Sequence, residues 1–581
     1  MTNNKIWRLL QPPPYESKLA REAGVSLLTA RLLLNRGISD SDSVRSFLFP
    51  RLSDLIDPML LTDMEKAVDL IITSMEKQER IAVFGDYDAD GITSTALLLN
   101  FFSDLGVRLF AYIPNRLDEG YGLNSKAIER LAEQGVRLII TVDCGISNKN
   151  EIELVKKLGM KVIVTDHHQI PSDFEPVCPA INPNRAESLF PFKDLAGVGV
   201  AFFLVIALRA GLRERNRFRD VPEVDLRQYL DLVALGTVAD MVPLTGQNRI
   251  IVNSGMDVMK NTRWPGLKAM KEISGIDKHH ISSYDLAFKL APRLNAPGRM
   301  GDTATGLRAL TTNSEAIAED TARQLNRINM QRQQIEGDIL EEIETVMIPE
   351  LDLTEKRTII LAKKGWHRGV LGIVASKLLG KYNRPTIILG IEDGIARGSG
   401  RSIDGFNLHR SMASLSHLFE KFGGHYHAAG CTLRESNIEE MARRLEEIAQ
   451  KEMKEEDLIP AMDIEAEIPI SGLTLDTVRD IRSLGPFGSG NQEPMFYSGD
   501  LMVIDSWVVG ERHLKLRLGQ GDAVIEAIGF GLGEIHPLVG GSINMVFTPG
   551  INRWNGHEKV ELKINDLELS DGNNTKLMRM K

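Results

Sequence analysis

The pattern of apolar and polar positions changes at Arg80, where short β-branched runs begin to alternate with amphipathic stretches. The apolar runs are IAVF (81–84), VRLFAYI (107–113), RLIITV (137–142) and KVIVT (161–165). The stretches between them have helical spacing, and each ends on a glycine suited to a helix C-cap: 93–106, 125–135 and 150–159. This alternation predicts a doubly wound domain with a parallel sheet over about residues 55–250.

A long helix is predicted between Asn313 and Met347, because this segment contains no proline and one apolar face. The residues of that face are Ile317, Thr321, Leu325, Ile328, Ile335, Ile339 and Ile343. Pro349 ends the helix, and a second alternating block at 358–390 predicts another α/β domain. The long helix would connect the two domains.

The last part of the chain, after about residue 456, is rich in predicted strands. The segments 512–518 and 559–569 alternate with period two, and Asn555-Gly556 favours a hairpin turn. A small β-barrel or sandwich is expected here.

Composition narrows the class of protein. The chain has 581 residues, 43% of them hydrophobic and 25% charged, which predicts several folded domains. Its three cysteines form no CxxC pair, so neither a disulfide framework nor a structural zinc site is expected, and a reducing cytoplasm is favoured. No apolar run reaches the length of a membrane span, and the run 195–208 is interpreted as a buried core helix. A net charge of −10 means that binding nucleic acid would require a local basic groove or bound cations.

The segment GDYDADG (85–91) places Asp86, Asp88 and Asp90 directly after an apolar strand. Three carboxylates at this spacing repel one another unless a metal or an array of donors compensates. An EF-hand calcium loop is the alternative, but its twelfth position is Leu97 where a glutamate is needed, and the preceding segment is strand-like.

Two further strands end in the same way, one in Asp143 and the other in Asp166-His167-His168. Because the carboxyl ends of parallel strands share one crevice, these groups are expected to meet there. Asp240, at the end of the apolar helix 229–240, is a further candidate. Carboxylates with imidazole suit Mn²⁺ or Mg²⁺ better than structural zinc. Considered alone, an aspartate after a strand is usually a helix N-cap, and a pair of histidines usually lies in a solvated loop.

In combination, GDYDADG, VDCG and TDHH resemble the DHH phosphoesterase superfamily, and GGHYHAAG (423–430) resembles the motif of its associated DHHA1 domain. Five other segments narrow the resemblance to the single-strand-specific 5′→3′ DNA exonucleases of that superfamily: 114–122, 292–300, 367–378, 398–402 and 486–494. The resemblance covers nearly the whole chain from about residue 50.

The resemblance implies an α/β multi-domain hydrolase. It divides the chain into an N-terminal segment (1–54), a parallel-sheet DHH catalytic domain (55–312), a connecting helix (313–349), a DHHA1 domain (350–455) and a β-barrel resembling an OB-fold (456–581). Two Mn²⁺ or Mg²⁺ ions would be held by Asp88, Asp90, Asp143, His167 and Asp240, with Asp143 bridging them and Asp86 and His168 bracing the site.

The same resemblance implies how DNA is held. Arg116, Ser399 and Arg401 would bind the terminal 5′-phosphate, although either arginine alone is more commonly a surface ion pair. Tyr121 would stack on a base or belong to the core. The further DNA contacts are Arg293, Asn295, Gly424 and His425. Lys515 and Arg517 lie on a strand face that would track single strands or be a solvated edge.

The expected activity is degradation of single-stranded DNA to 5′-mononucleotides in DNA recombination and repair. The expected partners are single-stranded DNA, single-strand-binding protein and a helicase, with no membrane, and the chain is expected to be a monomer. Two alternatives are a hydrolase of short oligonucleotides or cyclic dinucleotides and a metal-free scaffold. The additional segments argue against the first, and the presence of every carboxylate and both histidines argues against the second.

Overall fold

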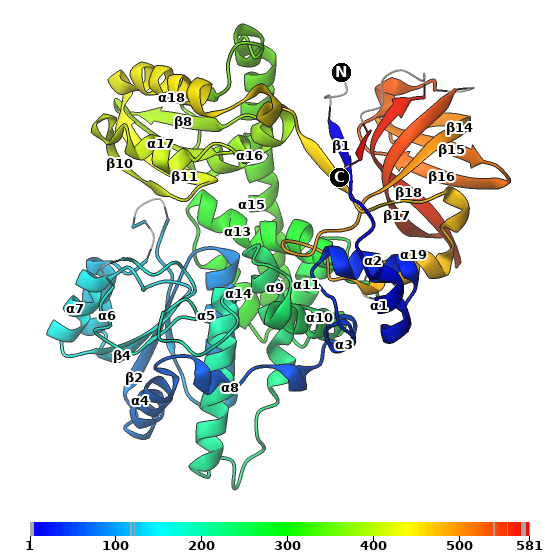
Figure 1. Ribbon diagram of the computed structural model, residues 1–581. Coiled ribbons are helices and arrows are strands. Elements are labelled where there is room, and N and C mark those ends of the chain that lie inside the picture. The colour runs from blue at the N-terminus through cyan, green and yellow to red at the C-terminus, as the bar shows by residue number, and fades with distance from the viewer. Residues whose placement is uncertain are drawn as a thin grey trace. The chain divides into compact units, whose positions relative to one another are not determined.

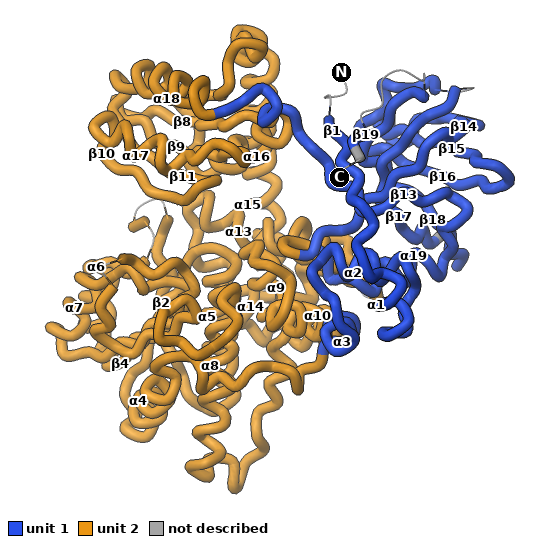
Figure 2. Tube along the Cα trace, in the orientation of Figure 1, with its two compact units in different colours: residues 1–50, 453–487, 491–581 blue, residues 51–452, 488–490 orange. Residues whose placement is uncertain are grey.

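The computed structural model describes residues 5–116, 119–120, 122–172, 174–277, 279–538, 541–554, 556–570 and 577–579. Tyr121 and Asn555 lie outside the described residues. The chain forms two compact units (Figure 2). The larger unit contains Arg51–Glu452 and Gly488–Gly490, and the barrel unit contains Met1–Pro50, Met453–Phe487 and Asn491–Lys581.

The larger unit contains the predicted parallel sheet, which has a fifth strand, Ala180–Ile181, beyond the four predicted from sequence. Its strands are β2 (Arg80–Gly85), β3 (Phe110–Tyr112), β4 (Val136–Val142), β5 (Lys161–Thr165) and β6 (Ala180–Ile181), in the order β3-β2-β4-β5-β6. The predicted strand 107–113 is shorter in the structure, since only Phe110–Tyr112 pairs with β2. Because β3 and β4 flank β2 on opposite sides, the strand order switches at β2, where ligands bind in open α/β sheets.

Helices cover both faces of this sheet (Figure 1). Alternate residues of β2 point to different cores: Ile81 and Val83 belong to one apolar cluster, and Ala82 and Phe84 to another. The first cluster includes residues of α4 (Met64–Glu76), α5 (Ala89–Asp104) and α8 (Gly197–Glu214), and the second includes residues of α6 (Ser125–Glu133) and α7 (Lys149–Lys157). The run 195–208 lies in buried α8, as predicted.

Helices continue the first core and lead to the long helix. They are α9 (Leu230–Ala239), α10 (Gly246–Lys260), α11 (Pro265–Ile273), α12 (Ser283–Asp285), a π-helical turn (Leu286–Leu290), α13 (Ala291–Met300), α14 (Thr305–Thr311) and α15 (Glu315–Glu342). After α15 the chain forms a second π-helical turn, Ile343–Met347.

The middle of α15 differs from the predicted apolar face. The buried residues there are Asn329, Arg332 and Glu336, while Ile328 and Ile335 are only half-buried. Arg332 pairs with Glu336 and donates to the Asn329 side-chain oxygen at 2.7 Å. These internal partners allow polar side chains to be buried where periodicity alone predicts apolar ones.

A second sheet in the larger unit combines parallel and antiparallel pairing in the order β10-β11-β9-β8-β7. Its strands are β7 (Ile359–Lys364), β8 (Thr386–Glu392), β9 (Ile395–Arg401), β10 (Phe419–Gly424) and β11 (Ala428–Arg434). The helices around it are α16 (Leu371–Tyr382), α17 (Leu408–Ala413) and α18 (Ile438–Glu452). This is the predicted second α/β domain.

The barrel unit contains a closed five-stranded barrel, which confirms the OB-like prediction. Its strands are β14 (Phe496–Val509), β15 (His513–Gln520), β16 (Ala523–Gly529), β17 (Ser542–Trp554) and β18 (His557–Leu569). Helix α19 (Leu475–Ser483) and strand β13 (Ala466–Glu467) flank it. The N-terminal helices belong to the same core: α1 (Glu16–Ala23), α2 (Leu27–Asn35) and α3 (Ser41–Leu48).

The two ends of the chain meet in the barrel unit. Strand β1 (Ile6–Leu9) pairs in parallel with β12 (Ala461–Ile464) and with β19 (Leu577–Arg579). Arg36 and Glu465 form an ion pair of 2.8 Å that is largely shielded from solvent. Among the described helices of the whole chain, none is both long and apolar enough to cross a membrane.

Candidate active site

Three neighbouring strand ends bring the predicted carboxylates and histidines together. The loop after β2 carries Asp86 and Asp88, and Asp88 caps α5 by accepting the amides of Asp90 (3.0 Å) and Gly91 (3.1 Å). Asp143 follows β4, and Asp166-His167-His168 follows β5. Asp240 is the C-cap of α9. We call Asp86, Asp88, Asp90, Asp143 and Asp240 the acidic group.

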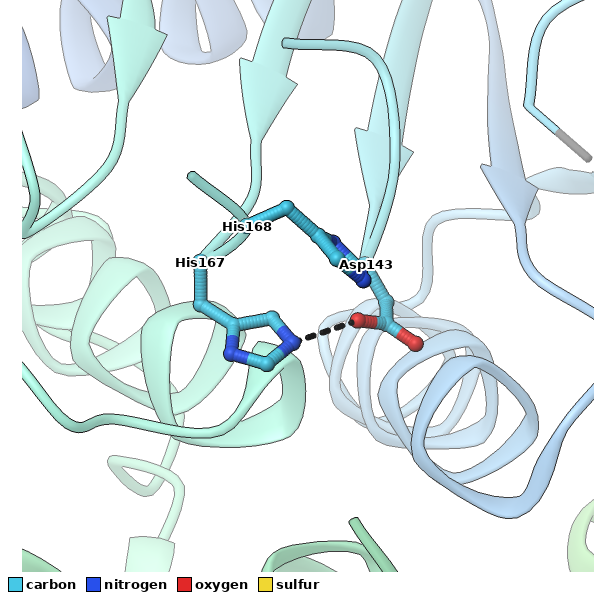
Figure 3. Close-up of side chains that lie close together, drawn as sticks. All are labelled: Asp143, His167 and His168. Atoms are coloured by element: carbon cyan, nitrogen blue, oxygen red, sulfur yellow. Dashed lines mark ion pairs between the residues drawn. The ribbon is translucent and has the colours of Figure 1, made fainter. Parts of the chain in front are cut away.

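His167 lies at the centre of this arrangement. Its Nε2 atom is 3.2 Å from Asp143 Oδ1, 3.5 Å from Asp240 Oδ2 and 4.0 Å from Asp90 Oδ2. Figure 3 shows the His167 ring directed at the Asp143 carboxylate, with His168 beside them. The potential ligand atoms fall into three overlapping sets: Asp90, His167 and Asp240; Asp86, Asp88 and Asp143; Asp143, His167 and His168. Asp143 and His167 each belong to two sets, a geometry suited to neighbouring cations.

The first residues of α8 contact two members of the acidic group, Asp90 and Asp143. Asp90 accepts the amides of Gly197 (2.6 Å) and Val198 (2.7 Å), so a helix N-terminus stabilises this buried carboxylate. A Cβ atom on Gly197 would lie 2.5 Å from Asp143 Oδ1, so only glycine fits beside Asp143. Sequence reasoning missed this contact. The available signal was the glycine spacing in AGVGV, which we interpreted only as part of a buried helix.

Burial and mutual repulsion make four carboxyl groups of the site hard to ionise: Asp86, Asp90, Asp143 and Asp240. Burial, together with the neighbouring carboxylates, raises the pKa of Asp86 and Asp143 well above the usual range. Burial and Asp88 raise the pKa of Asp90 to about 7, and burial with Asp90 raises the pKa of Asp240 to about 9. In the absence of a cation, the repulsion between the carboxylates favours their protonated forms. A divalent cation would compensate this repulsion.

The two histidines have opposite electrostatic environments. Burial and the positive charge of His168 lower the pKa of His167 to about 4, so its imidazole is neutral at pH 7. For His168, the hydrogen bond with Asp166 (2.7 Å) and the charge of Asp166 outweigh burial and raise the pKa to about 9.

Asp166 is the fully buried residue that fixes this loop. It accepts the amides of His167 (2.7 Å), His168 (3.0 Å) and Ile146 (2.9 Å). Burial opposes its ionisation, but the bonds from His168 and the amides hold the pKa of Asp166 below its usual range. Asp166 therefore positions both histidines, a role separate from the predicted ligand set.

The donor set fits Mn²⁺ or Mg²⁺. Within the described part of the chain, no hydrogen bond reaches the buried atoms Asp86 Oδ1 and His167 Nε2. Several carboxylate oxygens and one neutral imidazole converge without a thiolate, a combination that suits hard divalent cations.

An arginine group (Arg116, Arg299 and Arg401) lies near the acidic group. Arg116 stacks over the Tyr87 ring at 5.2 Å, and Arg299 donates to the Gly369 carbonyl at 3.2 Å. Burial, then Arg116 and Arg332 close by, lower the pKa of Arg299 to about 10. Burial, then Arg116, lower the pKa of Arg401. Among the described residues, no carboxylate forms an ion pair with these three guanidinium groups.

Ser399 and Arg401 occupy one face of β9, two residues apart. A Cβ atom on Gly372 of α16 would lie 3.2 Å from Arg401 Nη2 and 3.5 Å from Ser399 Oγ, so a small residue borders both groups. Arg401 pairs across the sheet with Ala428, which follows the turn of the β10–β11 hairpin next to Gly424 and exposed His425.

Two of the remaining predicted DNA contacts, Arg293 and Asn295, already have protein partners. Arg293 donates to Asn326 Oδ1 (3.1 Å) and to the Lys289 carbonyl (2.6 Å). Asn295 Oδ1 accepts the Ala89 amide at 2.7 Å. Tyr121 lies outside the described residues. Sequence reasoning also missed Arg299 as a site residue, although it belongs to the segment PRLNAPGRM that carried the resemblance.

Comparison with known proteins identifies the family. Three family domains match: "DHH family, N-terminal domain" at residues 80–237, "DHHA1 domain" at 355–451 and "RecJ OB domain" at 464–566. The single-stranded-DNA-specific exonuclease RecJ of Bacillus subtilis strain 168 is 36% identical, over 97% of this chain and 71% of that protein. The chain belongs to the RecJ family.

Solved RecJ structures agree with this assignment. The crystal structure of RecJ from Thermus thermophilus in complex with Mn²⁺ matches with a TM-score of 0.83 and 30% identity, covering 98% of this chain and 80% of that one. The Mg²⁺ complex of the same protein matches with a TM-score of 0.77 and 29% identity, covering 98% and 79%. RecJ membership thus extends from the sheet carrying the acidic group to the barrel.

Proposed function

We propose that this chain is an Mn²⁺- or Mg²⁺-dependent exonuclease that degrades single-stranded DNA from the 5′ end to 5′-mononucleotides, in DNA recombination and repair. The observation that carries the proposal is the acidic group around neutral His167, with the arginine group nearby. One group is suited to divalent cations and the other to phosphate. Membership of the RecJ family supports the same substrate.

The residues proposed to hold two cations are Asp88, Asp90, Asp143, His167 and Asp240, with Asp86 and His168 at the edge of the site. When bound, paired cations activate a water molecule and neutralise the leaving 3′-oxygen. The central placement of Asp143 and His167 supports a bridging role for Asp143. His167 offers an uncharged nitrogen, so it needs to lose no proton before acting as a ligand.

Residues outside the metal site would determine the end from which the DNA strand is degraded. Arg116, Ser399 and Arg401 would hold the terminal 5′-phosphate, since a guanidinium offers paired donors to phosphate oxygens. With the 5′ end fixed there, the first internal phosphodiester would lie at the acidic group. Gly424 and His425 would contact the strand from the hairpin beside Arg401.

The biological setting is proposed on the same basis. Single-strand-binding protein and a helicase would supply exposed single strands, the chain would act as a monomer, and its place of action would be the cytoplasm. The five domains would keep the boundaries 1–54, 55–312, 313–349, 350–455 and 456–581.

The test is product analysis on long single strands labelled at either the 5′ or the 3′ end, with Mn²⁺ or Mg²⁺ added and with chelator as the control. We expect a labelled mononucleotide at once from the 5′ label and only late from the 3′ label. Rapid release from the 3′ label, or activity confined to dinucleotides and cyclic dinucleotides, would contradict the proposal.

A further inference from the structure

The second half of α13 contacts the loop that carries Asp86 and Asp88. Asn295 Oδ1 accepts the amide of Ala89 at 2.7 Å. A Cβ atom on Gly298, one turn later, would lie 2.7 Å from the carbonyl oxygen of Tyr87. Helix α13 therefore contacts the metal loop (residues 86–90) on both sides of Asp88, through the Asn295 side chain at Ala89 and through the Gly298 backbone at Tyr87.

The Ala89 amide is one of the first donors of α5, which have no partner within the helix. Asp88 caps the next two amides with Oδ1, but it does not reach that of Ala89. Asn295 supplies the missing acceptor from an element 206 residues away in the chain. The hydrogen bond thus determines where Asp88 and Asp90, on either side of Ala89, can lie.

The far end of α13 is anchored independently. Arg299 donates to the Gly369 carbonyl at 3.2 Å, and a Cβ atom on Gly369 would overlap the Arg299 carbonyl oxygen. The carbonyl of Gly301 accepts the side-chain amide of Asn115 at 3.3 Å. Because the helix is held at this end, Asn295 presents its oxygen to the metal loop from a fixed support.

We propose that Asn295 is a positioning residue for the metal site: its side-chain oxygen holds the Ala89 amide and so sets the spacing of Asp88 and Asp90. This inference rests on the proposed metal-dependent function. It gives Asn295 a task beyond the DNA contact expected from the sequence, and it makes Gly298 part of the same support.

The test measures how nuclease activity of the full chain depends on Mn²⁺ concentration, together with Mn²⁺ binding by titration calorimetry. Asn295→Ala should raise the half-saturating Mn²⁺ concentration about 10- to 100-fold, the usual loss when a residue supporting a metal ligand is removed. Asn295→Asp keeps an acceptor oxygen at the same place but adds a negative charge beside the acidic group, so it should require clearly less Mn²⁺ than Asn295→Ala. Gly298→Ala should shift the requirement in the same direction as Asn295→Ala, because its Cβ displaces Tyr87.

Ser282→Ala is the matched control. Ser282 accepts the Asp285 amide at 3.3 Å and caps the same run of helix, away from the metal loop. It should lower the unfolding temperature, as we also expect of Asn295→Ala, without changing the Mn²⁺ requirement.

Two results would overturn the inference. If Asn295→Ala keeps the wild-type Mn²⁺ requirement and only raises the KM for DNA, Asn295 is a DNA contact alone. If Asn295→Asp is as defective in Mn²⁺ binding as Asn295→Ala, the oxygen acceptor is not what matters. Failure of the proposed function looks different, because the wild-type chain itself would then show no cation-dependent release of mononucleotides from the 5′ end.

Discussion

The acidic group and the arginine group respond differently to their own burial. Carboxylates can relieve repulsion by taking up protons, and the raised pKa values of Asp90 and Asp240 reflect this. A guanidinium stays charged throughout the physiological range, even for Arg299, whose pKa burial lowers to about 10. The arginine group therefore attracts anions at any working pH, whereas the acidic group becomes a cation site only as its protons leave.

Removing Asp143 should have the largest effect on the acidic group, because Asp143 belongs to two of the three potential ligand sets. Asp143→Ala should lower hydrolysis of single-stranded DNA by at least about 10³-fold, because loss of the proposed bridging ligand would remove several kcal/mol of charge stabilisation. Turnover should be measured at saturating Mn²⁺.

Asp143→Asn is the companion variant for Asp143→Ala. Asp143 has a φ of 61°, a conformation that asparagine tolerates better than alanine, so this variant separates lost charge from lost backbone conformation. Near-normal turnover in either variant would contradict the two-cation proposal.

The second expected effect concerns pH. In the metal-free fold Asp240 keeps its proton up to about pH 9 and Asp90 up to about pH 7, whereas both ionise near pH 4 in the unfolded chain. Cation binding must displace these protons, and each displaced proton makes Mn²⁺ affinity rise about tenfold per pH unit. The Asp240 proton should therefore raise Mn²⁺ affinity about 100-fold from pH 6.5 to 8.5, whereas Asp90 adds little above about pH 7.

The stability of the metal-free chain should change in the opposite direction. The folded state binds more protons than the unfolded state between about pH 4 and pH 9, so the free energy of unfolding decreases as pH rises through this window. Calorimetry and thermal unfolding at three pH values measure both trends. Asp240→Asn should flatten them, and a pH-independent Mn²⁺ affinity in the wild type would be the opposing result.

The third effect isolates the arginine group. Arg401→Ala would remove the proposed charge-assisted contact with the 5′-phosphate, worth about 1.5–3 kcal/mol, so the preference for 5′-phosphorylated over 5′-hydroxyl strands should fall about 10- to 150-fold. Activity on 5′-hydroxyl strands should change little, and the loss should be the same at pH 6.5 and 8.5. Equal slowing of both substrates would instead assign Arg401 to the fold or to general backbone binding.

The parallel sheet could be predicted from sequence because β-branched runs and glycine C-caps fix its strands, and because parallel strands end at one edge. The same rule is sufficient to predict that Asp86, Asp143 and His167 lie together. The contacts that complete the site come from distant segments: Gly197 lies 107 residues from Asp90, and Asn295 lies 206 residues from Ala89. The spacing of apolar residues along the chain does not predict contacts between segments this far apart.

The burial of charged side chains was the other feature that could not be predicted from the sequence. The face of α15 contains Arg332 and Glu336 where the helical period predicted only apolar residues, since each charge has a partner that periodicity does not reveal. Arg299 likewise looks like any surface arginine until the fold places it among Arg116 and Arg401.

The smallest expected effect tests whether the arginine group differs from basic residues that are held in ion pairs. In the barrel, Lys515 pairs with Glu561 and with Glu526 (3.3 Å), so its charge is already neutralised. The segment 464–566 carries eight lysines and arginines against fourteen acidic residues. Lys515→Ala should therefore change the affinity of the Asp143→Asn protein for single-stranded DNA by less than about twofold, because a lysine held by carboxylates releases few counterions from DNA.

Filter binding at several salt concentrations measures this, and Arg401→Ala in the same background should lower affinity severalfold with a shallower salt dependence. A larger loss from Lys515→Ala than from Arg401→Ala would mean that the barrel carries the main phosphate track.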